Sequence, residues 1–165
     1  MRIKKFVAIL SIAGALALSV NPAVADPKPK GAKASDSQTI ANFYAGTTRI
    51  WKRCNGGGIY FGAGWEAKAY CNQNAPAVAW GEWSVKKGKL CSQVVWHWRK
   101  DGQARSEEGK KDCIAHITDA EGTIWRRWND DKDWWRLQSV KEDKKAVKGF
   151  KFKSKFNRTK KKSGV

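Results

Sequence analysis

The sequence predicts a mainly β fold: a small antiparallel meander that forms a curved sheet or an up-and-down barrel, with a calycin-like barrel as one form. Seven or eight short stretches alternate apolar and polar residues, with turn residues between them. Neither a strand–helix–strand unit nor an internal repeat is visible, which argues against a parallel sheet. One short N-terminal helix and a disordered basic tail complete the expected architecture.

The first 25 residues have the three parts of a secretory signal peptide. Basic residues come first, an apolar run follows at 6–20, and Ala23-Val24-Ala25 forms a small-residue cleavage site. A membrane anchor is the alternative, but it needs about 20 apolar residues, and this run is shorter and ends before Pro22. We therefore expect cleavage after Ala25, a periplasmic or secreted protein, and no transmembrane segment in the mature chain.

The mature chain is expected to have three parts. Residues 26–36 are rich in Pro, Lys, Gly and Ala and predict a flexible tether. Residues 37–140 predict a Trp-rich, disulfide-bonded β domain, and residues 141–165 a Lys-rich tail. At the start of the domain, Ser35 and Gln38 match a capping box, and Gly46 suits the end of the helix.

The expected strands follow the helix at short spacing. The stretch Lys86-Lys87-Gly88-Lys89 predicts a hairpin turn, and residues 99–110 a polar loop. The predicted strands cover residues 47–53, 59–61, 65–71, 77–85, 89–98, 111–118, 123–128 and 133–137.

Four cysteines, all in the mature part, predict two disulfides in an exported chain. Three pairings exist, and sequence neighbours in a meander lie close in space, which favours Cys54–Cys71 and Cys91–Cys113. No Cys-x-x-Cys pair is present, so a zinc site is not expected. No other metal or cofactor motif was found.

Ten tryptophans lie between Trp51 and Trp135. Core packing is the ordinary role of such residues, and stacking against sugar rings is the functional alternative. Neighbours in a strand face opposite sides, so some of the indoles must point outward. The candidates for ligand stacking are Trp80, Trp83, Trp96, Trp98, Trp134 and Trp135.

The tail at 141–165 holds eleven basic residues and two acidic ones. Such a run is usually a solvated arm, and outside the cytoplasm it suits acidic polysaccharide, lipopolysaccharide or an anionic membrane surface, with nucleic acid as a non-specific partner. Phe150, Phe152 and Phe156 alternate with lysines, as in a last strand or a segment that folds onto a polyanion. The candidates for anion binding are Lys148, Lys151, Lys153, Lys155, Arg158, Lys160, Lys161 and Lys162.

Catalysis is not expected. His97 and His116 both lie in strand patterns, and no nucleophile–base motif accompanies them. Glu66 and Glu82 lie near tryptophans, which supports only a weak alternative, a small cell-wall glycan hydrolase. The leading hypothesis is a non-enzymatic protein that binds acidic envelope or extracellular polymer; a calycin-type barrel for a small apolar ligand is the second.

Several segments together resemble a known family. They are Phe43-Tyr44-Ala45-Gly46-Thr47-Thr48, the hairpin from Gly81 to Cys91 (GEWSVKKGKLC), Cys113, and Asp133-Trp134-Trp135-Arg136-Leu137. This pattern is similar to domain of unknown function 995, a family of small exported alphaproteobacterial proteins. The resemblance implies a β-rich exported protein with a Cys91–Cys113 pair and implies no activity. Cys54, Cys71 and the Lys-rich tail look like departures from the pattern or extensions of it.

Overall fold

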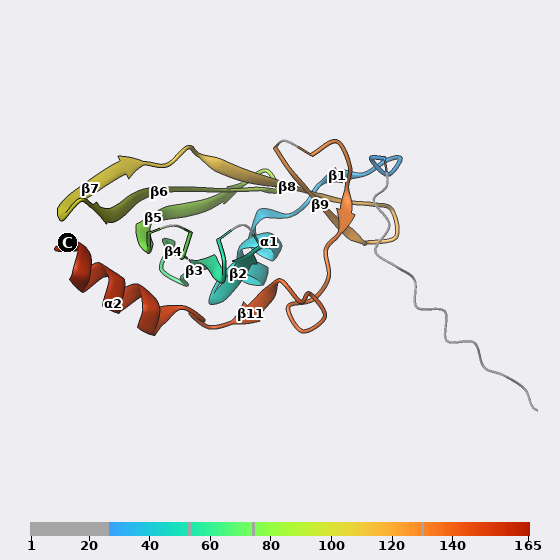
Figure 1. The fold of residues 1–165 in the computed structure, drawn as a ribbon. Helices are drawn as coiled ribbons and strands as arrows, with labels where there is room; N and C mark the ends of the chain where they lie inside the picture. The colour runs from blue at the N-terminus through green and yellow to red at the C-terminus, as the bar shows by residue number, and fades with distance from the viewer. Residues whose placement is uncertain (1–26, 53, 74, 130) are drawn as a thin grey trace, which may run out of the picture.

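The computed structural model describes residues 27–52, 54–73, 75–129 and 131–165. In this part of the chain one antiparallel sheet of eleven strands curls into a half-barrel (Figure 1), so the predicted fold class is confirmed. Helix α1 (Ser37–Tyr44) packs on the inner face, and helix α2 (Lys153–Ser163) packs on the outer face. The predicted signal peptide and cleavage site lie outside the described residues.

The strands run in the order β10-β9-β8-β6-β5-β4-β3-β2-β11, with β1 beside β8 and β7 beside β6. Their bounds are β1 Lys33–Ala34, β2 Thr47–Trp51, β3 Gly57–Phe61, β4 Glu66–Cys71, β5 Ala77–Lys86, β6 Lys89–Lys100, β7 Gln103–Glu108, β8 Asp112–Thr118, β9 Ile124–Trp128, β10 Trp135–Arg136 and β11 Ala146–Lys148. Both ends of the order, β10 and β11, are neighbours in the chain. The connection between them, residues 137–145, is called the strap below.

The predicted disulfides, Cys54–Cys71 and Cys91–Cys113, are both present. Cys91 and Cys113 are direct cross-strand partners of β6 and β8. The other bridge ties the segment before β3 to the end of β4. Each bridge therefore joins parts of the meander that lie next to each other, as the neighbour argument predicted.

The predicted hairpin turn between β5 and β6 is also confirmed. Lys87 and Gly88 have φ values of 49° and 69°, the left-handed pair that a two-residue hairpin needs. A Cβ at Gly88 would lie 2.7 Å from the carbonyl oxygen of His116, so glycine is required here for space as well as for conformation.

Gly88→Ala is expected to lower the free energy of unfolding by about 1–2 kcal/mol, because it adds a backbone clash to left-handed strain. Gly102→Ala is the matched control, since Gly102 has φ of 75° but no atom within 4 Å of an added Cβ. Urea unfolding of both variants measures the difference. Equal losses of unfolding free energy in the two variants would mean that the backbone around Gly88 moves to accommodate the added Cβ.

Helix α1 fills the inner face of the half-barrel. Ile40 and Tyr44 are fully buried and pack with Phe61 and Trp83 of the sheet. Small residues on β4 and β5, among them Ala67, leave room for these large side chains. Helix α1 therefore packs against large side chains on the described inner face, and the calycin-type site for a small apolar ligand stays a prediction.

The start of α1 differs from the predicted capping box. Asp36, not Ser35, is the N-cap, because its carboxylate accepts from the backbone N–H of Thr39 at 2.8 Å. Ser35 instead bonds to β8, where its hydroxyl lies 2.9 Å from that of Thr118. The end of the predicted tether is thus paired with β8 through β1. Short polar side chains at adjacent positions both suit a cap, so the sequence did not separate them.

The predicted loop at 99–110 is wrong, because most of it forms β7, which pairs with the outer half of β6. Asp101 and Gly102 make the turn, with φ values of 51° and 75°. Every residue of β7 is exposed, on both faces of the strand, so its sequence shows no alternation of apolar and polar residues. Backbone hydrogen bonds pair β7 with β6, and an apolar–polar pattern does not predict such pairing.

The predicted disordered tail is also wrong. Residues 146–148 form β11 beside β2, and residues 153–163 form α2. One stripe of the helix is buried, formed by Phe152, Phe156, Thr159 and Ser163. These positions recur at the 3.6-residue period of a helix, and Gly164 ends it in the left-handed conformation.

A second, smaller core holds α2 against the outer face of the sheet. Phe152 and Phe156 pack with Tyr70 and Val78, all at most 6% exposed. Phe152 stacks on Tyr70 with ring centroids 5.9 Å apart. The end of the basic tail is therefore packed against the sheet, and the helix determines on which side each of its lysines lies.

Candidate functional site

The predicted stacking tryptophans lie in different environments. Trp83 and Trp134 are 3% and 5% exposed, so the prediction that these two stack against a ligand is not supported. Trp80 is sandwiched between His97, at 4.0 Å between ring centroids, and the ammonium of Lys160. Trp96, Trp98 and Trp135 are half-buried. Trp65, 46% exposed, was missed among the candidates.

A groove lies between α2 and the ends of β4 and β6, with a volume of about 460 Å³. Helix α2 forms one wall, and the segment after β4 forms the other. Arg99 of β6 reaches the C-terminal turn of α2, where its guanidinium donates to the carbonyl of Lys162 at 3.5 Å. The lining residues are Tyr70, Asn72, Ala75, Pro76, Arg99, Lys155, Arg158, Thr159, Lys162 and Ser163.

The groove combines a positive rim with an apolar wall. Four of the lining residues are cations, and none is acidic. Among the described residues, none of these cations forms an ion pair. Tyr70, Ala75 and Pro76 form the apolar side, with hydroxyl and amide groups between. Converging cations without a counter-charge attract anions, and the apolar side suits the ring of a sugar.

Three of the predicted anion-binding residues, Lys155, Arg158 and Lys162, line this groove. Lys160 instead lies 4.6 Å over the ring of Trp80. The remaining four, Lys148, Lys151, Lys153 and Lys161, are exposed outside the groove. The helix thus gathers part of the predicted set into one site and leaves the rest as solvated charges.

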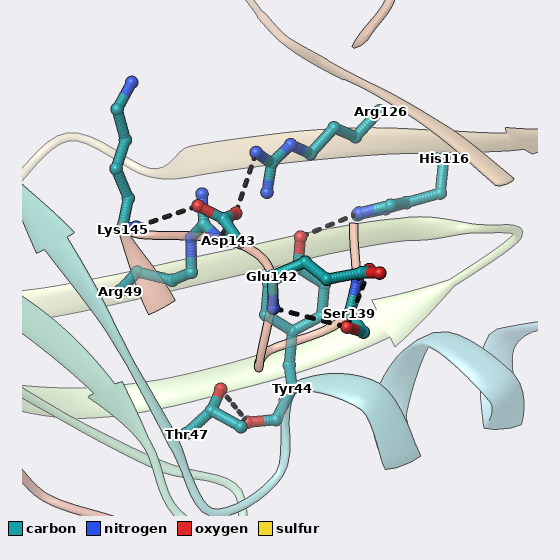
Figure 2. Close-up of polar contacts among 9 residues, drawn as sticks. All are labelled: Tyr44, Thr47, Arg49, His116, Arg126, Ser139, Glu142, Asp143 and Lys145. Carbon is teal, nitrogen blue, oxygen red and sulfur yellow. Dashed lines mark hydrogen bonds and ion pairs between the residues drawn. The ribbon is translucent and has the colours of Figure 1, made fainter. Parts of the chain in front are cut away.

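A second polar site lies inside the half-barrel, where Asp143 of the strap joins two strands far apart in the sheet (Figure 2). Its Oδ2 accepts from Arg49 of β2 at 2.5 Å and from Arg126 of β9 at 3.0 Å. Its Oδ1 accepts from the backbone N–H of Lys145. Strands β2 and β9 lie next to opposite edges of the sheet. The carboxylate therefore connects the two sides of the half-barrel through its arginine contacts, in place of backbone hydrogen bonds between strands.

Tyr44 and His116 continue the same interior cluster (Figure 2). The Tyr44 hydroxyl lies 3.0 Å from Nε2 of His116, and Nδ1 of His116 lies 3.1 Å from the carbonyl of Gly88. A carbonyl only accepts, so Nδ1 carries the proton and Nε2 accepts from the tyrosine. Sequence reasoning placed His116 in a strand without a role, and the structure makes it part of this network.

Burial sets the ionisation of the cluster. It lowers the pKa of His116 to about 4, although the hydrogen bond to Gly88 opposes it. Burial also raises the pKa of Tyr44 against the nearby charges of Arg49 and Arg126. At Asp143 burial acts to raise the pKa, but the hydrogen bond and charge of Arg49 hold it below its ordinary value. At neutral pH the ionised groups are therefore the two arginines and Asp143.

Stability is expected to fall as pH drops from about 6.5 to 4, because His116 is neutral when folded and gains a proton when unfolded. In this window, the slope of the unfolding free energy against pH should approach the value for one proton taken up on unfolding. Unfolding in urea at several pH values measures it. His116→Gln should remove most of the slope, while His97→Gln should keep most of it, because burial lowers the pKa of the half-buried His97 as well but to a smaller extent than that of His116. An unchanged slope in His116→Gln would contradict this assignment.

Glu66 and Glu82 are direct cross-strand partners of β4 and β5 and therefore share the outer face. They lie side by side on neighbouring strands of one sheet, and Glu66 also contacts Lys68 at 3.8 Å. The structure thus places the two carboxylates on one face, and the small glycan hydrolase stays a prediction.

The described residues contain no group of three or more His, Cys, Asp or Glu side chains placed to hold a metal ion. No helix in the same part of the chain has the length and apolar character to span a bilayer.

Sequence reasoning missed several residues of both sites. Tyr70 of the groove stands in an ordinary strand pattern, and Arg99 begins the charged stretch that was predicted to be a loop. Arg49 and Arg126 each occupy an inward position of a strand. A charged residue at such a position needs a buried partner, so the sequence alone could have indicated a polar site in the interior. Asp143 had no comparable signal, because it was counted with a solvated tail.

One family model matches the chain, described as "Protein of unknown function (DUF995)", over residues 9–154. The interior cluster lies within the match, and most of α2 lies beyond it. No curated protein and no solved structure matches the chain.

Proposed function

Because the chain belongs to the DUF995 family, to which no activity is assigned, we propose a function from its own surface: it binds acidic envelope or extracellular polymer in the groove beside α2. The observation that carries the proposal is the set of four groove cations along an apolar wall, none of which has an acidic partner among the described residues. Carboxylated or phosphorylated sugars offer both an anion and a ring face. Acidic polysaccharide and lipopolysaccharide share this chemistry.

We also propose that the protein acts outside the cytoplasm. The two disulfides are consistent with an oxidising compartment, and the N-terminal pattern of charge, apolar run and small residues supports cleavage after Ala25. An anionic membrane surface and, non-specifically, nucleic acid are further surfaces that a basic chain of this kind attracts. The protein is proposed to bind without catalysis.

The experiment must leave the fold intact. A chain cut at Val140 would lose Asp143, β11 and α2, so its failure to bind would not separate unfolding from loss of a site. The double variant Arg158→Gln/Lys162→Gln removes two groove charges from the exposed side of α2. Lys153→Gln/Lys161→Gln removes two charges from the same helix outside the groove.

The mature protein and both variants are run over an acidic polysaccharide resin with a salt gradient. Charge contacts give a steep salt dependence, and each lost contact should lower the logarithmic slope by about one. The groove variant should elute at clearly lower salt than its matched control. Equal elution of the two variants would mean that net charge alone explains binding, and it would reject the groove as the binding site. No retention of the unaltered protein at low salt would reject the proposed function.

A further inference from the structure

Strand β7 forms a free edge of the sheet. It lies at the margin of the molecule and pairs only with β6 (Figure 1). All six of its residues are exposed, and within the described part of the chain no backbone hydrogen bond outside the β6 ladder reaches it. Such an edge presents a row of backbone N–H and C=O groups that can pair with a strand of another chain.

The register between β7 and β6 shows which backbone groups are available. Just after β7, the N–H of Gly109 donates to the carbonyl of Val94 at 2.8 Å. Residue pairs in an antiparallel ladder alternate between hydrogen-bonded and non-hydrogen-bonded, so every second residue of β7 bonds to β6. The backbone groups of the remaining residues, Ala104, Ser106 and Glu108, therefore point to the free edge.

The charges on β7 suit pairing of the strand with a second copy of itself. Arg105 and Glu107 flank Ser106 and share one face of the strand. When two copies run antiparallel with Ser106 opposite Ser106, Arg105 of each copy lies directly opposite Glu107 of the other. The same register joins the free backbone groups of Ser106 to each other, and those of Ala104 to those of Glu108. Backbone bonding and charge thus favour the same alignment.

Neither of these charges has an ionic partner among the described residues. Arg105 donates to the neutral side-chain oxygen of Gln103 at 2.6 Å, and Glu107 forms no ion pair. Both side chains are exposed, so they can change partners without loss of packing. Opposite charges directly across an antiparallel pair stabilise it, and like charges destabilise it.

We propose that β7 is the interface of a homodimer, in which two copies pair their β7 strands antiparallel about a two-fold axis at Ser106. The pairing joins the two sheets and forms two Arg105–Glu107 ion pairs. Use of the same patch by both copies is the usual form of a two-fold interface. The contact is small beside the roughly 1,200 Å² of a stable interface, so the dimer is weak and exchanges with the monomer.

A consequence for polymer binding rests on the proposed function. Ser106 lies opposite His97 of β6, which stacks on Trp80 beneath Lys160 of α2. The free edge therefore borders the face that α2 covers. A two-fold axis between antiparallel edge strands is perpendicular to the sheet, so both α2 helices and both grooves would lie on the same side. One polymer chain that reaches both grooves would bind with avidity.

Sedimentation equilibrium of the mature protein without polymer tests the dimer. The apparent mass should rise from monomer toward dimer with increasing protein concentration. Arg105→Glu and Glu107→Arg each place like charges opposite each other, and each should raise the dissociation constant about tenfold. An equimolar mixture of these two variants has opposite charges at both contacts, so it should dimerise about as well as the unaltered protein.

A second pair of variants tests the backbone pairing. Ser106→Pro removes the outward N–H at the centre of the interface and leaves the β6 ladder intact, because proline is accepted on edge strands. Ser106→Ala keeps this N–H and is the matched control. The proline variant should stay monomeric, and the alanine variant should dimerise normally.

Three results would overturn the proposal. They are a monomer at every concentration, a mixture of the charge variants that associates no better than either variant alone, and equal dimerisation by the two Ser106 variants. The groove variant Arg158→Gln/Lys162→Gln should dimerise normally, because its substitutions lie outside β7. Failure of polymer binding would therefore leave the result on the dimer unchanged.

Discussion

Asp143→Asn is expected to lower the free energy of unfolding by about 3–5 kcal/mol, because it leaves two buried arginines without their shared counter-charge. The amide keeps the shape of the carboxylate but not its charge. Arg49 and Arg126 would then repel each other between opposite sides of the half-barrel. Few single changes in this chain should weaken it more, because the strap links the two sheet edges through this residue.

Urea unfolding followed by tryptophan fluorescence measures the loss. Glu142→Gln is the matched control, since Glu142 is the exposed neighbour whose side chain, among the described residues, bonds to Ser139 within the strap. Its variant should lose far less stability. In the background of Arg126→Met, Asp143→Asn should cost less than alone, because one of the repelling charges is absent. Additive losses would show that charge repulsion is not the cause.

Phe156→Ala is expected to release α2 from the sheet and abolish the groove. Phe156 is 5% exposed and contacts Trp80 and Phe150 in the small outer core, and loss of a buried phenyl ring costs about 3–5 kcal/mol. The helix is short and strongly basic, so it has little stability without this contact. Hydrogen exchange at the α2 amides should become fast while β5 and β6 stay protected.

The same variant tests whether the groove needs a docked helix. Its net charge is unchanged, so retention on the acidic resin should fall only if the positions of the cations matter. Asn157→Ala, at the exposed neighbouring position, is the control and should behave like the unaltered protein. Unchanged retention with a released helix would mean that a disordered basic tail is sufficient for binding.

The central strands could be predicted because their signals are local. Alternating residues, the Lys87-Gly88 turn and the disulfide neighbours all follow from short-range geometry. The C-terminal helix was missed because Phe150, Phe152 and Phe156 fit a two-residue period. Phe152 and Phe156, four apart, also fit a helix, but the dense lysines around them favoured a solvated arm. Contact with Tyr70 and Val78 decides between the two periods.

The sites were harder to predict than the fold. Three groove cations were named from the tail, but Arg99 and Tyr70 join them only when α2 docks. Likewise, Arg49, Arg126 and Asp143 are separated by many residues and meet only after the sheet has curled. Long-range closure is set by packing of the whole sheet, and no local pattern reports it.

The central claim is that acidic polymer binds in the groove beside α2. Titration of the isotope-labelled mature protein with a short oligogalacturonate, followed by amide chemical shifts, tests it most directly. The account predicts saturable shifts confined to Tyr70, Asn72, Arg99 and Thr159 and their neighbours. Shifts that follow exposed lysines such as Lys148 and Lys153, with the groove unaffected, would contradict it.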